Sequence, residues 1–267
     1  IVPLYWLATS FKVLVMLLSA TLAFHADLDF LKIAASYFFI PYKKPSGVIE
    51  TFHGVGWTLV FEMFFYCVFS LALFLRTNIY IFVGAIRAIC AAISLVRPTD
   101  YSVSQFLFDP IVLEFLFGML IGRYALLGIF IPTRPAIAIA AVTFFLLLFM
   151  NWGNGVPRLF SAGIPAAALV FSVVSLERFL NHRIPRFLVF LGAASYSMYL
   201  AHPLFLPAIP TLLNKTNISI AAVSVGLSIV PAIIGAAVVY RFIETPATRF
   251  AQRLICKYPR QVSPSAS

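Results

Sequence analysis

Five ionisable residues lie inside long apolar runs of this sequence, where a charge is costly. They are Lys12, Glu62, Arg87, Glu114 and His202. A charged side chain at the centre of a membrane-spanning helix costs about 2.5 to 3.5 kcal/mol on insertion scales, so such residues usually face a cavity or a partner helix. A carboxylate and an imidazole together can orient and deprotonate a hydroxyl group. Each residue therefore has two interpretations, a functional group or a polar contact between helices.

Glu62 and His202 are the two candidates for catalysis. Glu62 follows Trp57 by five residues, about 8 Å along a helix, which places its carboxylate just inside one membrane boundary. Tyr66 lies at i+4 on the same helical face and is positioned to hydrogen-bond that carboxylate. His202 lies fifteen residues after Phe187, about 22 Å along a straight helix, so we expect it at a similar depth.

A polar stripe surrounds the histidine. Ser195, Tyr199 and His202 have i, i+4, i+7 spacing and share one face of a helix, and Pro203 is expected to kink that helix. A polar stripe in a membrane favours a cavity that contains a substrate. The alternative is a histidine that only packs and hydrogen-bonds, which is the more common use of a lone histidine.

Four further charged residues are candidates, and two of them could meet an anionic donor. Lys12 and Arg87 lie near the middle of apolar runs, and each could bind such a donor, pair with Glu114 or brace neighbouring helices. Arg241 and Glu244 end the last apolar run at i, i+3 spacing and could simply pair with each other.

Templates of soluble enzymes are absent. The sequence contains no glycine-rich phosphate loop, no HExxH zinc motif and no GxSxG nucleophile motif. Its cysteines, Cys67, Cys90 and Cys256, have no metal-ligand spacing, so we expect no metal site. The net charge is +10, but the basic residues are scattered between apolar runs, which excludes a continuous surface for nucleic acid.

The composition explains where these residues must be positioned. Hydrophobic residues make up 62% of the chain, charged residues only 10%, and the mean hydropathy is +0.99. Soluble domains are roughly 45 to 50% apolar and about 25% charged. The sequence therefore predicts an all-α, polytopic transmembrane helix bundle with about eight spans. The spans are expected near residues 2–24, 57–75, 79–96, 107–122, 136–150, 161–176, 187–212 and 218–242.

Basic residues give this bundle an orientation. Most of those outside the spans fall on the same side as the C-terminal tail, so the positive-inside rule predicts that both ends are cytoplasmic. Residues 1–250 then form one transmembrane domain, and residues 251–267 form a basic cytoplasmic tail. The long loop after the first span is expected outside the cell membrane, together with the segments near residues 97–106 and 151–160.

Several short segments, in order, resemble the membrane acyltransferase-3 family. Pro3-Leu4-Tyr5-Trp6 resembles the start of the third span of that family. Gly56 to Tyr66 resembles its W-S-L-x-x-E-x-x-F-Y segment, with Thr58 in place of the serine. Leu191 to Pro203 resembles its G-x-x-S-Y-x-x-Y-L-x-H-x-P segment, and Arg241 to Pro246 its closing R-F-I-E-x-P. The sequence around Trp57 is most similar to that of exopolysaccharide acetyltransferases of the rhizobial succinoglycan type.

The resemblance implies an enzyme of the bacterial inner membrane that transfers an acyl group, most simply acetyl, from acyl-CoA to a sugar hydroxyl. The acceptor is an extracytoplasmic polysaccharide or a lipid-linked oligosaccharide, and no cofactor is bound permanently. Glu62 would orient the substrate, and His202 would be a second polar contact. The implied substrate-binding residues are Trp57, Thr58, Tyr66, Ser195 and Tyr199, and the implied acyl-CoA-binding residues are Lys12, Arg87, Arg241 and Glu244.

A function of another class is also open, a transporter or flippase for a lipid-linked sugar or acyl intermediate. Intramembrane charges and a proline-broken span also mark transport sites. Two similarly broken spans in matching halves would favour transport, but only one clear break occurs, at Pro203, and no internal duplication is evident.

The resemblance also implies ten spans in the intact protein, with a catalytic arginine and histidine in the first. This sequence begins at Ile1, within what resembles the third span. We therefore expect the chain that begins at Ile1 to support no acyl transfer. Expression of the gene with its upstream region restored should recover transfer, measured as O-acetyl content of surface polysaccharide. Equal acetylation with both versions would contradict the expectation.

Overall fold

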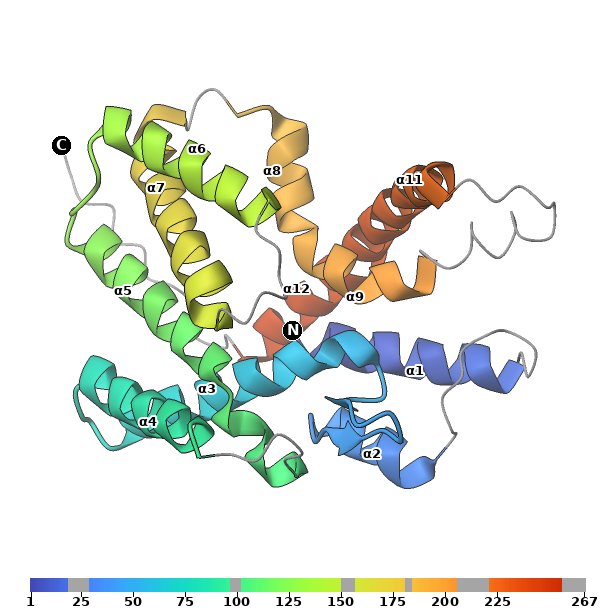
Figure 1. The fold of residues 1–267 in the computed structure, drawn as a ribbon. Coiled ribbons are helices and arrows are strands. Elements are labelled where there is room, and N and C mark those ends of the chain that lie inside the picture. Colours follow the sequence, from blue (N-terminus) through green and yellow to red (C-terminus); the bar gives the residue numbers. More distant parts are fainter. Residues whose placement is uncertain (19–28, 97–101, 150–156, 181–183, 206–220, 256–267) are drawn as a thin grey trace. The chain divides into compact units, whose positions relative to one another are not determined.

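The structure is a computed structural model that describes residues 1–18, 29–96, 102–149, 157–180, 184–205 and 221–255 (Figure 1). These residues form two compact units. The first unit contains Ile1–Phe38, Phe52–Gly56 and Arg186–Ser267, and the second contains Phe39–Thr51 and Trp57–Pro185. The short segment Phe52–Gly56 therefore belongs to a different unit from the residues on both sides of it.

The first unit is helical throughout its described residues. Its longest helices are α1, Val2–Leu18, and α11, Ala221–Val239, and both sequences are almost entirely apolar. Asp29 caps the N-terminus of α2 by accepting a hydrogen bond from the backbone N–H of Leu31. The remaining elements are α2 (Phe30–Tyr37), η1 (Gly54–Gly56), α8 (Arg186–Ala193), α9 (Ser195–Phe205), the π-helical η5 (Tyr240–Glu244) and α12 (Thr245–Ile255).

The second unit is also helical, apart from one small hairpin. Strands β1, Tyr42–Lys43, and β2, Ile49–Glu50, pair antiparallel, and Gly47 supplies a positive φ of 84° in the turn between them. The helices are α3 (Trp57–Phe74), α4 (Ile79–Ser94), η2 (Val103–Phe108), η3 (Pro110–Leu113), α5 (Glu114–Leu126), α6 (Thr133–Phe149), the π-helical η4 (Leu159–Gly163) and α7 (Ile164–Leu180).

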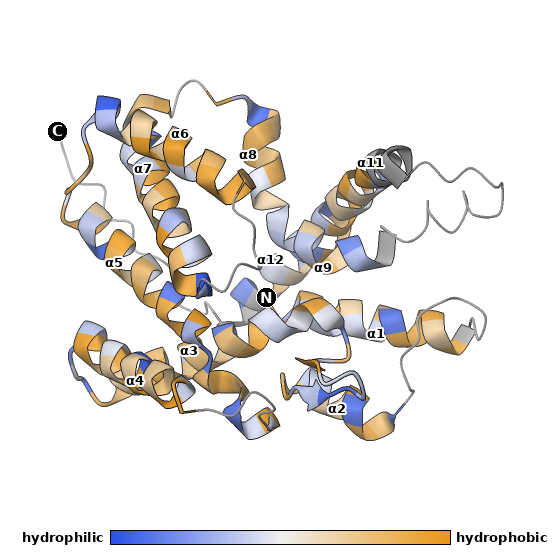
Figure 2. Cartoon of the chain, in the orientation of Figure 1, coloured by the Kyte–Doolittle hydropathy of each residue, from blue (hydrophilic) through white to orange (hydrophobic). Residues whose placement is uncertain are grey.

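Hydrophobic residues cover the helices of the second unit on most sides (Figure 2). On α6, for example, Ile137, Val142 and Phe145 are all more than half exposed. A helix that is apolar all round is stable where lipid, not water, surrounds it. The predicted all-α membrane protein is confirmed in its fold class by these helices.

The number of spans is not established. Among the described residues, three helices are long and apolar enough to cross a bilayer, Gly54–Phe74, Leu159–Glu177 and Ile229–Phe250. Three more apolar helices are shorter, Val2–Leu17, Ile79–Ser94 and Thr133–Phe149. These six segments correspond to six of the eight predicted spans.

The other two predicted spans differ from the structure. Residues 187–212 are not one straight helix, because α8 ends at Ala193, and α9 begins at Ser195 and runs in another direction (Figure 1). The predicted 22 Å path to His202 is therefore wrong. In the span predicted at residues 107–122, η3 precedes the α-helix because Pro110 follows the capping residue Asp109, so α5 begins only at Glu114. The predicted boundary at residue 250 lies within α12.

The link between α3 and α4 is tight and locally capped. Arg76 has a positive φ of 53°, and the Asn78 side chain accepts hydrogen bonds from the backbone N–H groups of Tyr80 and Ile81. This cap begins α4, which packs on α3 through the buried residues Val68, Ala72 and Val83.

Removal of the cap should therefore weaken the α3–α4 pair. We expect Asn78→Ala to lower the free energy of unfolding by about 1 kcal/mol, because two N–H groups lose their acceptor. Asn78→Asp, which retains an acceptor at the same place, should stay close to the parent protein. Denaturant unfolding in detergent measures both, and equal losses in the two variants would contradict the capping role.

Candidate functional site

In the first unit, two hydrogen bonds join helix α9 to the segment Phe52–Gly56. The Nε2 atom of His53 lies 2.9 Å from the backbone oxygen of Leu200. One helical position earlier, the Tyr199 hydroxyl donates to the backbone oxygen of Val55 at 2.7 Å. The polar face of α9, which also carries His202, is therefore fixed against a segment about 145 residues earlier in the chain.

Lys12 holds the same segment from α1. Its ammonium donates to the backbone oxygen of Phe52 at 2.7 Å and lies 4.9 Å from the centre of the Phe52 ring. The carbonyl dipole and the ring face both stabilise the positive charge. Lys12 therefore contacts a polar group within the first unit, which agrees with a role in bracing neighbouring elements.

His53 is the residue that sequence analysis missed. Its side chain is 1% exposed, and it approaches Tyr5 of α1 with a ring-centre separation of 6.2 Å. Because a carbonyl oxygen only accepts hydrogen bonds, the Nε2 atom facing Leu200 carries the proton, which leaves the lone pair on Nδ1. The one sequence signal was a histidine three residues ahead of Gly56, in a segment interpreted as an outer loop.

Burial keeps His53 uncharged at neutral pH. It lies outside the candidate span that begins at Gly54, and desolvation lowers its pKa from 6.5 to about 4. The hydrogen bond to Leu200 opposes this shift, and the charges of Lys12 and His202 add to it. The ring of His202 lies 5.9 Å from that of Tyr199.

Side-chain hydrogen bonds attach α2 to α1 on the N-terminal side of Lys12. Tyr5 and Ser36 share a buried hydrogen bond of 2.6 Å, and the indole of Trp6 donates to the backbone oxygen of Tyr37 at 2.8 Å. The Pro3-Leu4-Tyr5-Trp6 segment therefore contributes two of its side chains to the packing of α1 on α2, and Tyr5 also approaches His53.

The remaining predicted residues of the first unit are arranged differently from expectation. Ser195 is exposed at the first turn of α9, whereas Ser197 is buried and donates to the carboxylate of Glu244. Glu244 therefore bonds α9 and does not pair with Arg241, whose side chain is exposed. The predicted Arg241–Glu244 pair is wrong because the π-helical turn of η5 changes the i, i+3 geometry of a regular helix.

In the second unit, α3 presents the predicted site residues on two adjacent faces. The Tyr66 hydroxyl donates to Glu62 Oε1 at 2.7 Å, as the i, i+4 spacing predicted. Thr58 lies four residues before Glu62 on the same face. Trp57 is directed to the neighbouring face, where its ring meets Phe61 edge-on at 6.1 Å. Glu62 and His202 belong to different units, so their common depth stays a prediction.

Arg87 lies inside the second unit and is fully buried. Its guanidinium is stacked among three rings, 4.7 Å from Phe64, 5.4 Å from Phe65 and 5.0 Å from Phe115. None of its three nitrogens has a hydrogen-bond partner among the described residues. Glu114 pairs with Arg158 at 3.2 Å, so the suggested Arg87–Glu114 pair does not form. The aromatic faces stabilise the charge of Arg87 in place of a carboxylate.

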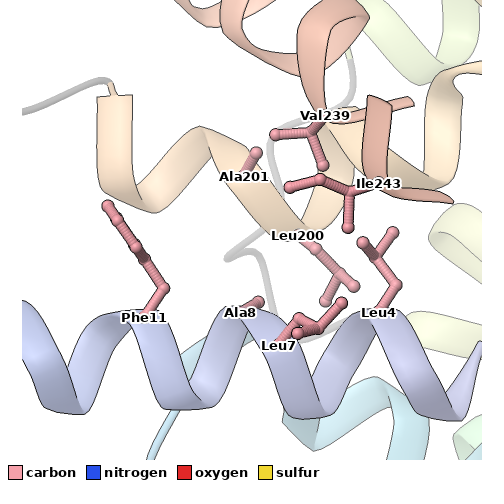
Figure 3. A pocket seen from close by; sticks show the side chains of 8 residues that line it. All are labelled: Leu4, Leu7, Ala8, Phe11, Leu200, Ala201, Val239 and Ile243. Atoms are coloured by element: carbon pink, nitrogen blue, oxygen red, sulfur yellow. The ribbon is translucent and has the colours of Figure 1, made fainter. Parts of the chain in front are cut away.

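Two further features limit the ligands that the described residues can hold. Within the described residues, no three His, Cys, Asp or Glu side chains are grouped to hold a metal ion. An apolar cavity of about 320 Å³ lies between α1, α9, α11 and η5 (Figure 3). Its walls include Leu4, Leu7, Leu200, Val239 and Ile243, which suit a hydrocarbon and not the phosphates of CoA.

Comparison with known proteins identifies the class of this chain. The family model described as an acyltransferase domain, of the acyltransferase-3 type, matches residues 1–241. The chain therefore belongs to this acyltransferase family, which confirms the resemblance found in the sequence.

One characterised relative has a more specific name. The chain is 35% identical over 214 residues to the "Exopolysaccharide production protein ExoZ" of Rhizobium meliloti (strain 1021). The matched region covers 76% of this chain and 64% of that protein, so the chain spans less than two thirds of the relative's length. No solved structure matches the chain.

The low pKa of His53 makes a pH dependence testable. Its folded-state pKa is depressed, so the stability it contributes is complete above about pH 6.5 and is lost as the pH falls towards 4. The shift corresponds to about 3 kcal/mol at the acid end. We expect His53→Gln, which keeps a donor for Leu200 but does not titrate, to remove this part of the acid sensitivity. Chemical unfolding at pH 7 and pH 4.5 measures it, and identical pH slopes in both proteins would contradict it.

Proposed function

We propose that this chain is the membrane part of an O-acyltransferase that acylates an exopolysaccharide. The donor is acyl-CoA, most simply acetyl-CoA, and the acceptor is a sugar hydroxyl of the polysaccharide or of its lipid-linked precursor. The family supports acyl transfer, and the name of the relative from Rhizobium meliloti supports the exopolysaccharide. The enzyme is placed in the bacterial inner membrane with its C-terminus in the cytoplasm, as the distribution of basic residues predicts.

The arrangement around α9 is the observation that carries this proposal within the first unit. One hydrogen bond fixes the side chain of Tyr199, and another fixes the backbone of Leu200. His202 follows on the same helix. His202 is partly exposed, whereas His53 is buried. Of these two histidines, His202 is thus the imidazole that a hydroxyl can reach, and we propose it as a base and not only as the second polar contact that the resemblance implies. His53 is a positioning residue that acts through the Leu200 carbonyl.

The reaction balances without a metal or a redox partner. The sugar hydroxyl transfers its proton to the imidazole of His202 as its oxygen attacks the thioester carbonyl of acyl-CoA. The carbon–sulfur bond then breaks, and the proton passes to the leaving thiolate. The products are the sugar ester and free CoA. General base catalysis of this kind contributes about 10² to 10⁴-fold in rate.

Glu62 is proposed as the carboxylate that orients the acceptor. Its Oε1 atom already accepts from Tyr66, and a carboxylate has further lone pairs for a sugar hydroxyl. Thr58 lies on the same face of α3 and supplies a hydroxyl one turn away. In the first unit, Ser195 is exposed at the first turn of α9, and Tyr199 lies three residues before His202 on the same helix.

The residues expected to bind acyl-CoA differ in how well the structure supports them. Arg241 is exposed and precedes the basic helix α12, so its charge is accessible to a phosphate. Lys12 carries a positive charge, and its ammonium donates to the backbone oxygen of Phe52. Arg87 is fully buried among rings, and Glu244 is negative and bonded to Ser197. We therefore propose Arg241 and Lys12 for the donor, with Arg87 and Glu244 supporting the helices.

The test is the O-acetyl content of the exopolysaccharide, measured by NMR in a deletion strain that carries the full-length gene or a variant. We expect His202→Gln to lower acetylation at least tenfold, since the proton acceptor is lost. His53→Leu should also lower it, and His53→Gln should restore a large part because glutamine can donate to Leu200. The matched control is Cys67→Ser, an exposed position on α3.

Protein amounts in the membrane must be equal in all strains. Normal acetylation by His202→Gln would contradict the proposed role of His202. Unchanged acetylation in the deletion strain, with a lipid-linked precursor accumulating, would instead support transport.

A further inference from the structure

A second pocket, in the second unit, has the composition of a carbohydrate site. It has a volume of about 380 Å³, within the range of about 300 to 1,000 Å³ that small-molecule pockets occupy. One wall is aromatic, with Trp57, Phe61 and Phe106. Asp109 and Arg158 contribute charged groups to the lining of the same pocket. We propose that this pocket binds one pyranose unit of the acceptor, and this inference rests on the proposed acyl transfer to a polysaccharide.

The aromatic wall is built by packing within α3 and η2. Phe61 is 2% exposed and lies 4.7 Å from Phe106, with the rings tilted by 32°. Trp57 packs edge-on against the same Phe61 ring at 6.1 Å, which restricts the movement of the indole. A rigid, supported ring offers a flat apolar face with little loss of conformational entropy on binding. The C–H face of a pyranose ring matches such a surface.

Asp109 supplies an acceptor for the hydroxyl groups of that sugar. Its Oδ1 atom accepts from the backbone N–H of Ile111 at 3.0 Å and so caps η3. This cap fixes the carboxylate at the pocket wall. Hydrogen bonds from hydroxyl groups to a carboxylate are charge-assisted and about twice as strong as neutral ones. Asp109 therefore both caps η3 and presents a negative charge to the pocket.

Arg158 is held at the pocket by Glu114. Its Nε atom pairs with Glu114 Oε1 at 3.2 Å, so its other guanidinium nitrogens can point elsewhere. Glu114 in turn lies against Gly163, where an added Cβ would be only 3.3 Å from its Cγ atom and 3.4 Å from Oε1. The π-helical turn Leu159–Gly163 thus gives Glu114 the room it needs to position Arg158.

The charges favour a sugar over the acyl-CoA donor. Among the described groups at the pocket and bonded to it, two carboxylates, Asp109 and Glu114, face one guanidinium, Arg158. The phosphates of CoA would be repelled by this excess of negative charge. A hydrocarbon chain would cover the charged groups of Asp109 and Arg158 and offer them no hydrogen-bonding group in place of water. The pocket residues also come from segments near 57, 106 and 158, which the sequence predicts at the extracytoplasmic boundary.

The test uses full-length protein in lipid nanodiscs and one probe, the oligosaccharide released from the strain's own exopolysaccharide and chemically de-O-acetylated. Saturation-transfer NMR reports sugar protons near aromatic rings, and titration gives the affinity. We expect Asp109→Asn to weaken binding by about tenfold or more, because asparagine keeps the cap acceptor but loses the charge. Trp57→Ala should abolish saturation transfer, and Trp57→Phe should restore part of it. Cys67→Ser should bind as the parent protein does.

Enzyme kinetics separate this pocket from the proposed reaction. We expect Asp109→Asn and Gly163→Ala to raise the KM for the oligosaccharide about tenfold and to leave the KM for acetyl-CoA unchanged. Sugar binding that depends on Asp109 in a protein without transfer activity would overturn the proposed function and keep the pocket. Transfer with an unchanged acceptor KM in Asp109→Asn, or displacement of the sugar by CoA, would overturn the pocket assignment.

Discussion

The hydrogen bond between His53 and the backbone of Leu200 is the contact on which the first unit depends. It joins residues 147 positions apart, and it is made by a buried imidazole whose pKa is lowered by desolvation. The neighbouring Tyr199–Val55 bond and the Lys12–Phe52 bond act on the same short segment. Two helix side chains, Tyr199 and Lys12, therefore satisfy backbone carbonyls of the segment Phe52–Gly56, and the His53 side chain of that segment satisfies a carbonyl of α9. The same contacts fix the face of α9 that carries His202.

The second unit uses aromatic rings in a comparable way. Arg87 is stabilised by three phenylalanine rings where no carboxylate is available, and Glu114 is thereby left to pair with Arg158. One face of α3 carries Glu62 and Tyr66, and the adjacent face carries Trp57 and Phe61. A single helix thus supports two kinds of chemistry, a carboxylate for orientation and an aromatic surface for recognition.

Much of this could be predicted because apolar composition and i, i+4 spacing are local properties. The helical class, the Glu62–Tyr66 contact and the acyltransferase resemblance all follow from short stretches of sequence. The break at Ala194 could not be predicted, since no proline or glycine pair marks it. His53 was missed because its structural role depends on a hydrogen bond to a residue 147 positions away. The exchange of partners among Arg87, Glu114 and Arg158 depends on packing between helices, which spacing along one helix does not reveal.

The most direct measurement is the pH dependence of kcat/KM for acetyl transfer by the full-length protein, comparing the parent with His202→Gln and His53→Gln. If His202 takes the proton from the sugar hydroxyl, the rate of the parent and of His53→Gln falls at acid pH, as one group becomes protonated. His202→Gln then retains only a low rate without that acid limb. A His202→Gln protein that keeps the parental rate and the same acid limb would contradict the assignment of His202.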